Sequence, residues 1–251
     1  MIISKRIISV FLFALFLLLP GCTSEVRPAS EVPAVEPTPE VSTVELTLRV
    51  AAISDSGSLL LADMNSNAVY RNTLPDGKTC PVGTLLSVTC ADSILEIYPE
   101  QLAEIHSVAE IEDGFDNRCA LYMQVLEDLW SEDQALQADT RYVGIDLSGT
   151  SLTESEEAAI AWRFGELKQK EPLNAGFDAL CRDGFIDQEN LYWEDGCLLS
   201  ITETESTDDS VVFDAEKWRS GLGAIFFTDC TAEQNASGHW SEYKAGGFAI
   251  S

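Results

Sequence analysis

The stretch Val44-Glu45-Leu46-Thr47-Leu48-Arg49-Val50 decides the fold of the first half of the chain. Its apolar residues alternate with polar ones, and successive side chains of a β-strand point to opposite faces, so the pattern predicts a half-buried strand. Shorter strand-like runs follow, separated by clusters of turn residues, at 58–64, 68–74, 84–89 and 94–98. Short strands at a spacing of about 8–12 residues predict a small barrel or sandwich over residues 44–112.

Three short stretches at the end of this segment carry a family resemblance. Pro81-Val82-Gly83, Leu86-Ser87-Val88 and Ile94-Leu95-Glu96-Ile97-Tyr98-Pro99 are similar to the end of a small OB-like β-barrel domain in lipoproteins of Gram-positive gut bacteria of the Firmicutes type. The resemblance covers nearly all of residues 44–112. Residues 119–130 and 217–223 are also similar to segments of gut-bacterial lipoproteins. The resemblance implies an OB-like five-stranded β-barrel and a place in the cell envelope, and it implies no activity.

Residues 116–251 predict a second domain that begins with helices. Apolar residues in 119–130 recur at helical spacing, which predicts an amphipathic helix. Thr153-Glu154-Ser155-Glu156 is a capping box, in which the side chains of Thr153 and Glu156 each satisfy a backbone amide. A second helix is therefore expected to begin there and to run to about residue 169, and a short helix is expected at 177–182.

Strands dominate the rest of the second domain. One strand is expected at 142–147, and Glu194-Asp195-Gly196 is typical of a hairpin turn between strands at 191–193 and 197–203. Further strands are expected at 224–228, 239–244 and 247–250. Because helices come first and most strands come later, the domain is predicted to be α+β rather than alternating α/β.

The first 43 residues predict export and a lipid anchor. Lys5 and Arg6 precede an apolar run at 7–19, which is typical of a signal peptide over residues 1–21. A membrane-spanning helix needs about 20 apolar residues, so the run is too short to span a bilayer. Residues 22–43 are rich in proline and glutamate, which predicts a disordered linker.

Leu19-Pro20-Gly21-Cys22 follows the apolar run directly and resembles the bacterial lipobox, although Pro20 departs from the usual small residue. The resemblance implies cleavage between Gly21 and Cys22 and acylation of the Cys22 thiol, a modification detectable as palmitate. Two acyl chains give a stable anchor. The expected location is the extracytoplasmic face of the cell membrane, with the membrane as a partner through the N-terminal lipid.

Acidic residues outnumber basic ones by 42 to 15, and the formal net charge is −27. A body with this charge repels nucleic acid and anionic lipid and tolerates cationic partners or, weakly, divalent cations. The simplest role of the charge is to keep the protein soluble.

The predicted order of elements in the second domain and the predicted barrel in the first both raise the question of nucleic-acid binding. Helix, short helix and hairpin is also the order of a winged-helix DNA-binding domain, and OB barrels often bind single strands. The candidate recognition stretch, 177–183, has one basic and two acidic residues, and residues 44–112 contain only Arg49, Arg71 and Lys78 as lysines or arginines. Because such binding depends on lysines and arginines that neutralise phosphates, no nucleic-acid partner is expected.

Six cysteines remain besides Cys22: Cys80, Cys90, Cys119, Cys181, Cys197 and Cys230. An even number in an exported protein permits disulfides, and six cysteines allow about 15 pairings. Cys80 and Cys90 flank one turn-and-strand unit and are the first candidates for a pair. Alternatively, the cysteines of a strict anaerobe would be buried thiols that pack as small hydrophobic residues.

The residues that carry catalysis or bind metals form no recognised motif. His106 and His239 each stand alone, so no metal site and no cofactor are predicted. Cys181 with a distant histidine could be drawn as a thiol dyad, but no motif supports it. Asp187-Gln188-Glu189-Asn190 supplies oxygen atoms without the spacing of a calcium-binding EF-hand, and a solvated loop is the preferred interpretation. The tryptophans could line a sugar site, although such residues more often form a core.

These observations favour a non-catalytic binding or scaffold role for an envelope lipoprotein, with no catalytic residue assigned. The partner could be a protein, a peptide or a glycan. The alternative is an extracytoplasmic hydrolase with an unrecognised carboxylate or cysteine site. A cleft lined by carboxylates with perturbed pKa values would favour the hydrolase, and a shallow polar face would favour the binding protein.

Overall fold

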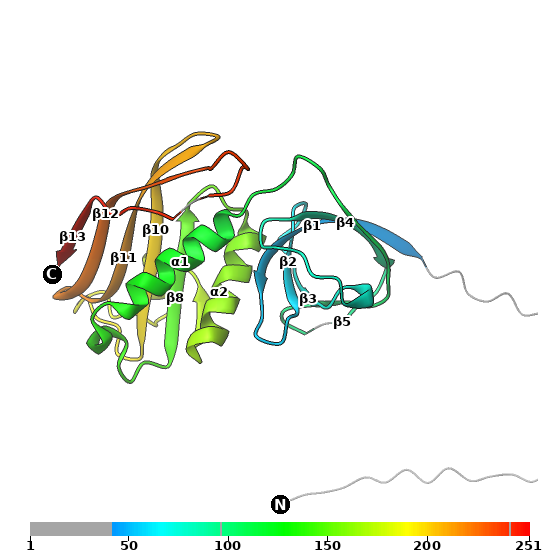
Figure 1. Ribbon diagram of the computed structural model, residues 1–251. Coiled ribbons are helices and arrows are strands. Elements are labelled where there is room, and N and C mark those ends of the chain that lie inside the picture. The colour runs from blue at the N-terminus through cyan, green and yellow to red at the C-terminus, as the bar shows by residue number, and fades with distance from the viewer. Residues whose placement is uncertain (1–41, 96, 241) are drawn as a thin grey trace, which may run out of the picture. The chain divides into compact units, whose positions relative to one another are not determined.

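The computed structural model describes residues 42–95, 97–240 and 242–251 (Figure 1). The predicted signal peptide, the lipidation and cleavage site at Gly21 and Cys22, and the linker up to residue 41 lie outside these residues. Residues 42 onward belong to one compact unit built on two main sheets. In the described part of the chain, no helix combines the length and the apolar character needed to cross a bilayer.

The first sheet has five antiparallel strands in the order β3-β2-β1-β4-β7. Its central strand β1 (Thr43–Ile53) buries Leu48 and Val50 and leaves Glu45 exposed to a greater extent, as the alternating pattern predicts. The other strands are β2 (Leu59–Asp63), β3 (Val69–Asn72), β4 (Leu85–Ala91) and β7 (Ile105–Glu110). A 3-10 turn (Pro75–Gly77) lies between β3 and β4, and β5 (Ile94–Leu95) pairs with β6 (Gln101–Leu102).

The first sheet differs from the expected barrel in two respects. It stays open, because β3 and β7 form its two edges and do not pair with each other in the described residues. The strand expected at 94–98 ends at Leu95, and β7 supplies the fifth strand instead. Pro99 has no amide hydrogen for a strand ladder, which disfavours a longer strand there. β7 was not predicted because it is an edge strand with little buried apolar surface, and so its sequence shows no clear alternation.

The second sheet has six strands in the order β13-β12-β11-β10-β8-β9. Three neighbours run parallel, namely β9 (Glu171–Asn174), β8 (Tyr142–Gly149) and β10 (Gly196–Ser206). The remaining three are antiparallel, namely β11 (Ser210–Ser220), β12 (Gly223–Glu233) and β13 (Gly247–Ile250). The mixture of mostly sheet with few helices confirms the predicted α+β class.

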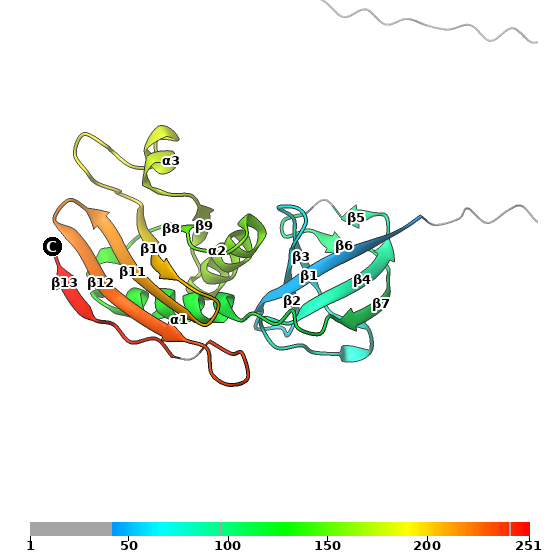
Figure 2. The ribbon, with the colours of Figure 1, turned by 90° about the horizontal axis from the view of Figure 1, so that it is seen from above.

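Helices cover both faces of the second sheet (Figures 1 and 2). The long helices α1 (Arg118–Ser131) and α2 (Glu154–Lys168) pack with Val143 and Leu199, whereas the short helix α3 (Phe177–Arg182) packs with the neighbouring Leu198. Neighbouring residues of a strand face opposite sides, so α3 lies on the other face from α1 and α2. All three helices were predicted, and the capping box of Thr153 and Glu156 is confirmed.

The predicted hairpin at 191–203 is wrong. β10 pairs with β8 on one side and with β11 on the other, and the true hairpin joins β10 to β11. Residues 191–193 form no strand, although Tyr192 makes single bridges to Asp187 and Ser220. β11 has 11 residues and pairs with β10 along most of its length. This longer ladder occupies the edge of β10 that the predicted hairpin assigned to residues 191–193. Of the strand expected at 239–244, the described residues Trp240 and Lys244 make isolated bridges to Gln234 and Thr231. The strand expected at 247–250 is confirmed as β13.

The two sheets, one in each predicted domain, share part of one hydrophobic core. Ala51, Leu60 and Val69 of the first sheet belong to the same buried cluster as residues of α1 and α2. Arg49 of β1 forms an ion pair with Glu156 of α2, with 2.9 Å between Nε and Oε1, and both side chains are nearly buried. The Ser155 hydroxyl donates to the carbonyl oxygen of Asp63 at 2.8 Å. Apolar packing and buried polar contacts therefore hold the two sheets together.

Candidate functional site

A polar cavity, here called the polar pocket, has a volume of about 540 Å³. Its wall is made by the end of β8, the first turns of α2 and the end of β9, with Asn67 from the turn between β2 and β3. The side chains that give it its character are Asn67, Asp146, Ser148, Glu154, Glu157 and Asn174. These side chains supply carboxylate, amide and hydroxyl oxygens.

The connectivity of the sheet explains why polar side chains gather at this edge. The chain leaves β8 through α2 to reach β9, and then returns through α3 to reach β10 on the other side of β8. In open sheets, ligands bind outside the carboxyl ends of parallel strands at the point where the direction of winding changes. Asp146 and Ser148 end β8 and Asn174 ends β9, so the polar pocket lies at such a point.

Local contacts fix the direction of the carboxylates. One oxygen of Asp146 accepts hydrogen bonds from the amide and the hydroxyl of Ser148, at 3.2 and 2.6 Å. The amide group of Asn67 donates to Glu154. A side chain larger than hydrogen at Gly176 would collide with Asp146, so glycine allows the chain after β9 to pass close to this carboxylate.

The field inside the polar pocket is negative. Burial, together with the nearby charges of Asp146, Glu154 and Glu156, raises the pKa of Glu157 to about 7. No lysine, arginine or histidine is among the described residues that line the pocket. A ligand that brings hydrogen-bond donors or a positive charge would therefore complement it. The described residues contain no group of three or more His, Cys, Asp or Glu side chains placed to hold a metal ion.

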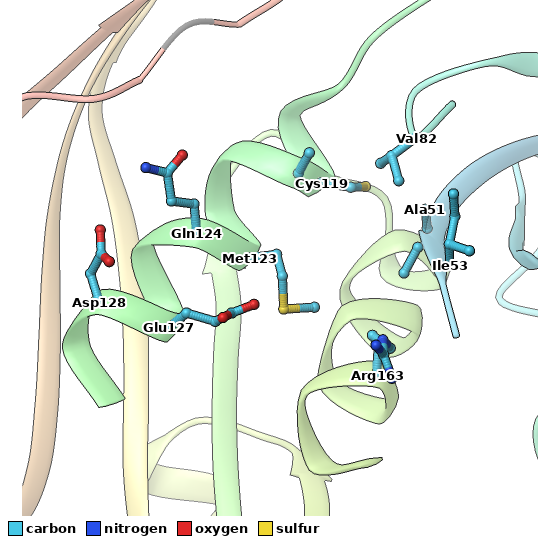
Figure 3. A pocket seen from close by; sticks show the side chains of 11 residues that line it. Ala51, Ile53, Val82, Cys119, Met123, Gln124, Glu127, Asp128 and Arg163 are labelled. Atoms are coloured by element: carbon cyan, nitrogen blue, oxygen red, sulfur yellow. The ribbon is translucent and has the colours of Figure 1, made fainter. Parts of the chain in front are cut away.

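A second cavity, here called the junction groove, lies where β1 meets α1 and α2 (Figure 3). Its volume is about 310 Å³, and Ala51, Ile53, Val82 and Met123 give it an apolar lining. Glu127 of α1 and Arg163 of α2 stand at its rim, and the carboxylate of Glu127 points toward Met123 and α2 in Figure 3. Its chemistry differs from that of the polar pocket, because most of its lining atoms cannot form hydrogen bonds.

The cysteines of the sequence analysis do not form a site. Cys80 and Cys90 lie in the same hydrophobic cluster of the first sheet, and both are free thiols in the structure, so the suggested disulfide is not formed there. Burial raises the pKa of both thiols. Burial and the charge of Asp178 likewise raise the pKa of Cys181, which disfavours the thiolate that a nucleophile needs.

The other candidate residues also have local structural roles. Asp187 accepts hydrogen bonds from the backbone amides of Glu189 and Asn190 and from the Asn190 side chain. The Asp187 carboxylate is therefore engaged by its own loop. His239 stacks on Phe115 with 4.3 Å between ring centroids. Trp193 and Trp240 are buried, and Trp130, Trp162 and Trp218 pack against the hydrophobic clusters, so the interpretation of the tryptophans as core residues is confirmed.

Sequence reasoning missed the polar pocket. The strand at 142–147 and the capped helix were both predicted, and a strand followed by a capped helix could have drawn attention to Asp146 and Glu157. The missing information was the strand at 171–174, whose parallel pairing with β8 places Asn174 opposite Ile145 and so brings it to the same pocket as Asp146. That pairing joins residues far apart in the sequence and leaves no periodic signal.

The polar pocket and the junction groove have to be interpreted from their own chemistry. Comparison with known protein families, with curated proteins and with solved structures finds no match for this chain.

Proposed function

We propose that this chain is a lipid-anchored binding protein of the extracytoplasmic face of the cell membrane, and that the polar pocket binds a small cationic ligand with several hydrogen-bond donors. An amino sugar is one ligand of this chemistry. The observation that carries the proposal is the set of oxygen acceptors at the carboxyl ends of β8 and β9, with three carboxylates and no cation among the described lining residues. Because glycans and amines are rich in donors, such a wall would orient them through several hydrogen bonds at once.

The test of the pocket is calorimetric titration of the full chain, solubilised in detergent, with glucosamine and with N-acetylglucosamine. We expect the charged amine to bind more tightly, because acetylation removes the positive charge that the carboxylates complement. Asp146→Asn should weaken glucosamine binding, whereas Glu189→Gln, on an exposed loop, should leave it unchanged. Equal binding of the two sugars would contradict the proposal.

The anchor is tested separately. The lipobox residues support it, since Gly21 and Cys22 follow a signal-peptide pattern. Cys22→Ala should move the protein from the membrane fraction to the soluble fraction and abolish palmitate labelling. Unchanged membrane association of this variant would contradict the anchor without affecting the pocket. The relation of the first sheet to OB-like lipoprotein domains is part of the same proposal, and it rests on the sequence resemblance.

A second candidate function is hydrolysis, and a pocket lined by carboxylates in which the pKa of Glu157 is raised is the feature expected to favour it. A carboxyl group whose pKa lies near 7 can both give and take a proton at neutral pH, and Glu157 has Asp146 close enough to raise its pKa. In this alternative, Glu157 is the general acid and Asp146 the second carboxylate. Turnover of chromogenic glycosides by the full chain that disappears in Glu157→Gln would favour a hydrolase over a binding protein.

A further inference from the structure

The junction groove is an opening that the chain's own side chains leave unfilled. Ala51 and Ala52, near the end of β1, and Ala120 of α1 are among the residues that line it. These small side chains help to leave a space of about 310 Å³. Ile53 at its edge is 38% exposed, which is unusual for a large aliphatic side chain at the end of a central strand.

The rim of the junction groove carries more negative than positive charge. Arg163 is the cation that lines it, and its guanidinium group is already held by Asp55 at 2.6 Å and by Glu166 at 2.9 Å. Glu127 has Lys168 only at 3.9 Å, and the Glu127 side chain is 46% exposed. Asp128, which also lines the groove, accepts a hydrogen bond from the Tyr243 hydroxyl at 2.9 Å. A positive group beside the groove would therefore meet two carboxylates and one lining cation, and Glu127 is held only by the long, half-exposed contact with Lys168.

We propose that the junction groove is a docking site for a peptide segment that carries an apolar side chain next to a lysine or arginine. The apolar side chain would enter between Ala51, Ala120 and Met123, and the cation would reach Glu127. Ligand cavities for whole small molecules span about 300–1,000 Å³, so a space at the lower limit suits one or two side chains better than a large ligand. This inference concerns a different surface from the polar pocket and does not depend on it.

Charge also argues against a second copy of this chain as the occupant. The formal net charge of −27 makes two copies repel each other, whereas it attracts a cationic peptide from a distance. The same general attraction would let any cationic peptide bind weakly anywhere on the surface. The experiment must therefore separate the groove from the overall charge.

The probe is a fluorescein-labelled hexapeptide with one leucine between two lysines in an otherwise glycine sequence, titrated against the detergent-solubilised full chain by polarisation. Replacing the leucine by glycine should weaken binding by at least about tenfold, because burial of each methylene contributes about 0.8 kcal/mol. Glu127→Gln should weaken binding by about fivefold, the upper end for an exposed ion pair. Ala120→Leu, a good helix former that fills the groove, should abolish specific binding.

The matched control is Glu189→Gln, which removes an equal charge from an exposed loop and should leave the affinity unchanged. Circular dichroism of each variant establishes that it is folded. Equal losses in Glu127→Gln and Glu189→Gln, or equal affinity for the leucine and glycine peptides, would overturn the proposal in favour of general electrostatic attraction. Self-association of the wild type that Ala120→Leu abolishes would assign the groove to a second copy instead.

Discussion

At the scale of single residues, Glu157 shows how the surroundings of a carboxyl group change its chemistry. Its ordinary pKa of 4.5 rises to about 7 because burial and three neighbouring carboxylates disfavour the charge. Folding therefore favours the protonated form. The stability that this proton contributes is present below about pH 4.5 and is lost as the pH rises through about 7, because the folded state then has to hold the charge.

Glu157→Gln should therefore stabilise the protein at high pH and not at low pH. We expect the free energy of unfolding at pH 8 to rise by about 1–2 kcal/mol over the wild type, a value reduced from the full shift because the group is only half-buried. At pH 4 the two proteins should be nearly equal, since glutamine resembles the protonated acid. Urea denaturation at both pH values measures this. The control Glu189→Gln should give the same small difference at both, and a variant no more stable than wild type at pH 8 would contradict the prediction.

Lys217 is a second residue whose role depends on its surroundings. Its side chain is completely buried, and its ammonium group donates to the carbonyl oxygens of Trp130, Glu132 and Asp133 and to the side chain of Gln137. These acceptors include the last carbonyls of α1, which have no partner within the helix. Nothing in the sequence around Lys217 separates it from an exposed lysine of a strand, because the acceptors lie on a segment about 85 residues away.

At the scale of elements, the capping box of α2 links a sequence signal to the wall of the polar pocket. The Thr153 hydroxyl accepts from the amide of Glu156, and the Glu156 carboxylate accepts from the amide of Thr153 at 2.9 Å. These bonds fix where α2 begins and thus where Glu154 and Glu157 stand.

Thr153→Ala should lower the free energy of unfolding by about 1 kcal/mol, the usual value for loss of an N-cap side chain. Thermal unfolding followed by circular dichroism checks this value. Ser237→Ala is a suitable control, because Ser237 is exposed and only its backbone amide donates a hydrogen bond at that turn. An equal change in the two variants would show that the cap contributes nothing to stability.

Local sequence signals predicted those elements whose stabilising contacts are also local. The apolar stripe of α1, the caps of α2 and the alternation of β1 all depend on residues within a few positions of one another. β7 was missed because its pairing partner, not its own pattern, makes it a strand. β11 does alternate buried with more exposed residues, but a buried lysine, Lys217, interrupts the apolar half of that pattern in the sequence. The same limit applies to the polar pocket, since Asp146 and Asn174 meet only after β8 and β9 pair. The open edge of the first sheet likewise depends on where β3 ends relative to β7, which no local pattern encodes.

At the scale of the whole molecule, the contact between the two sheets decides whether they unfold together. Arg49 belongs to the first sheet, while all five tryptophans lie between residues 130 and 240. Tryptophan fluorescence therefore reports on the second sheet and its helices. A change at Arg49 can affect that signal through the shared core, through the ion pair with Glu156, and through its hydrogen bonds to the carbonyl oxygens of Gly114 and Asp116.

Arg49→Met should lower the stability measured by tryptophan fluorescence by about 3–5 kcal/mol, because it leaves the carboxylate of Glu156 buried without its partner. The matched control is Lys78→Met in the first sheet, where the ion pair with Glu110 is exposed on both sides. That control should leave the fluorescence transition nearly unchanged, because solvent screens an exposed ion pair. If Arg49→Met left the tryptophan transition where it was, the two sheets would be energetically independent.

The distribution of charge over the molecule bears on nucleic-acid binding. The relation to OB-like domains that we propose for the first sheet raises this question, because OB barrels often bind single strands on a basic groove with stacked aromatic residues. The three lysine and arginine residues of the first sheet are all engaged by acids: Arg49 by Glu156, Arg71 by Glu166 and Lys78 by Glu110. None of them is left to neutralise a phosphate without breaking an ion pair.

We therefore predict that the full chain binds no single-stranded oligonucleotide with micromolar or tighter affinity. Non-specific binding by nucleic-acid proteins has dissociation constants of about 10⁻⁴–10⁻⁶ M, and it depends on the counterions that each phosphate contact releases. A molecule with a net charge of −27, in which the three basic residues of the first sheet are already paired, gains little from that release and must also bring two negative surfaces together. A polarisation titration with a labelled oligonucleotide at low salt should stay flat. Micromolar binding that weakens as salt is added would contradict the prediction and would require a basic surface outside the described residues.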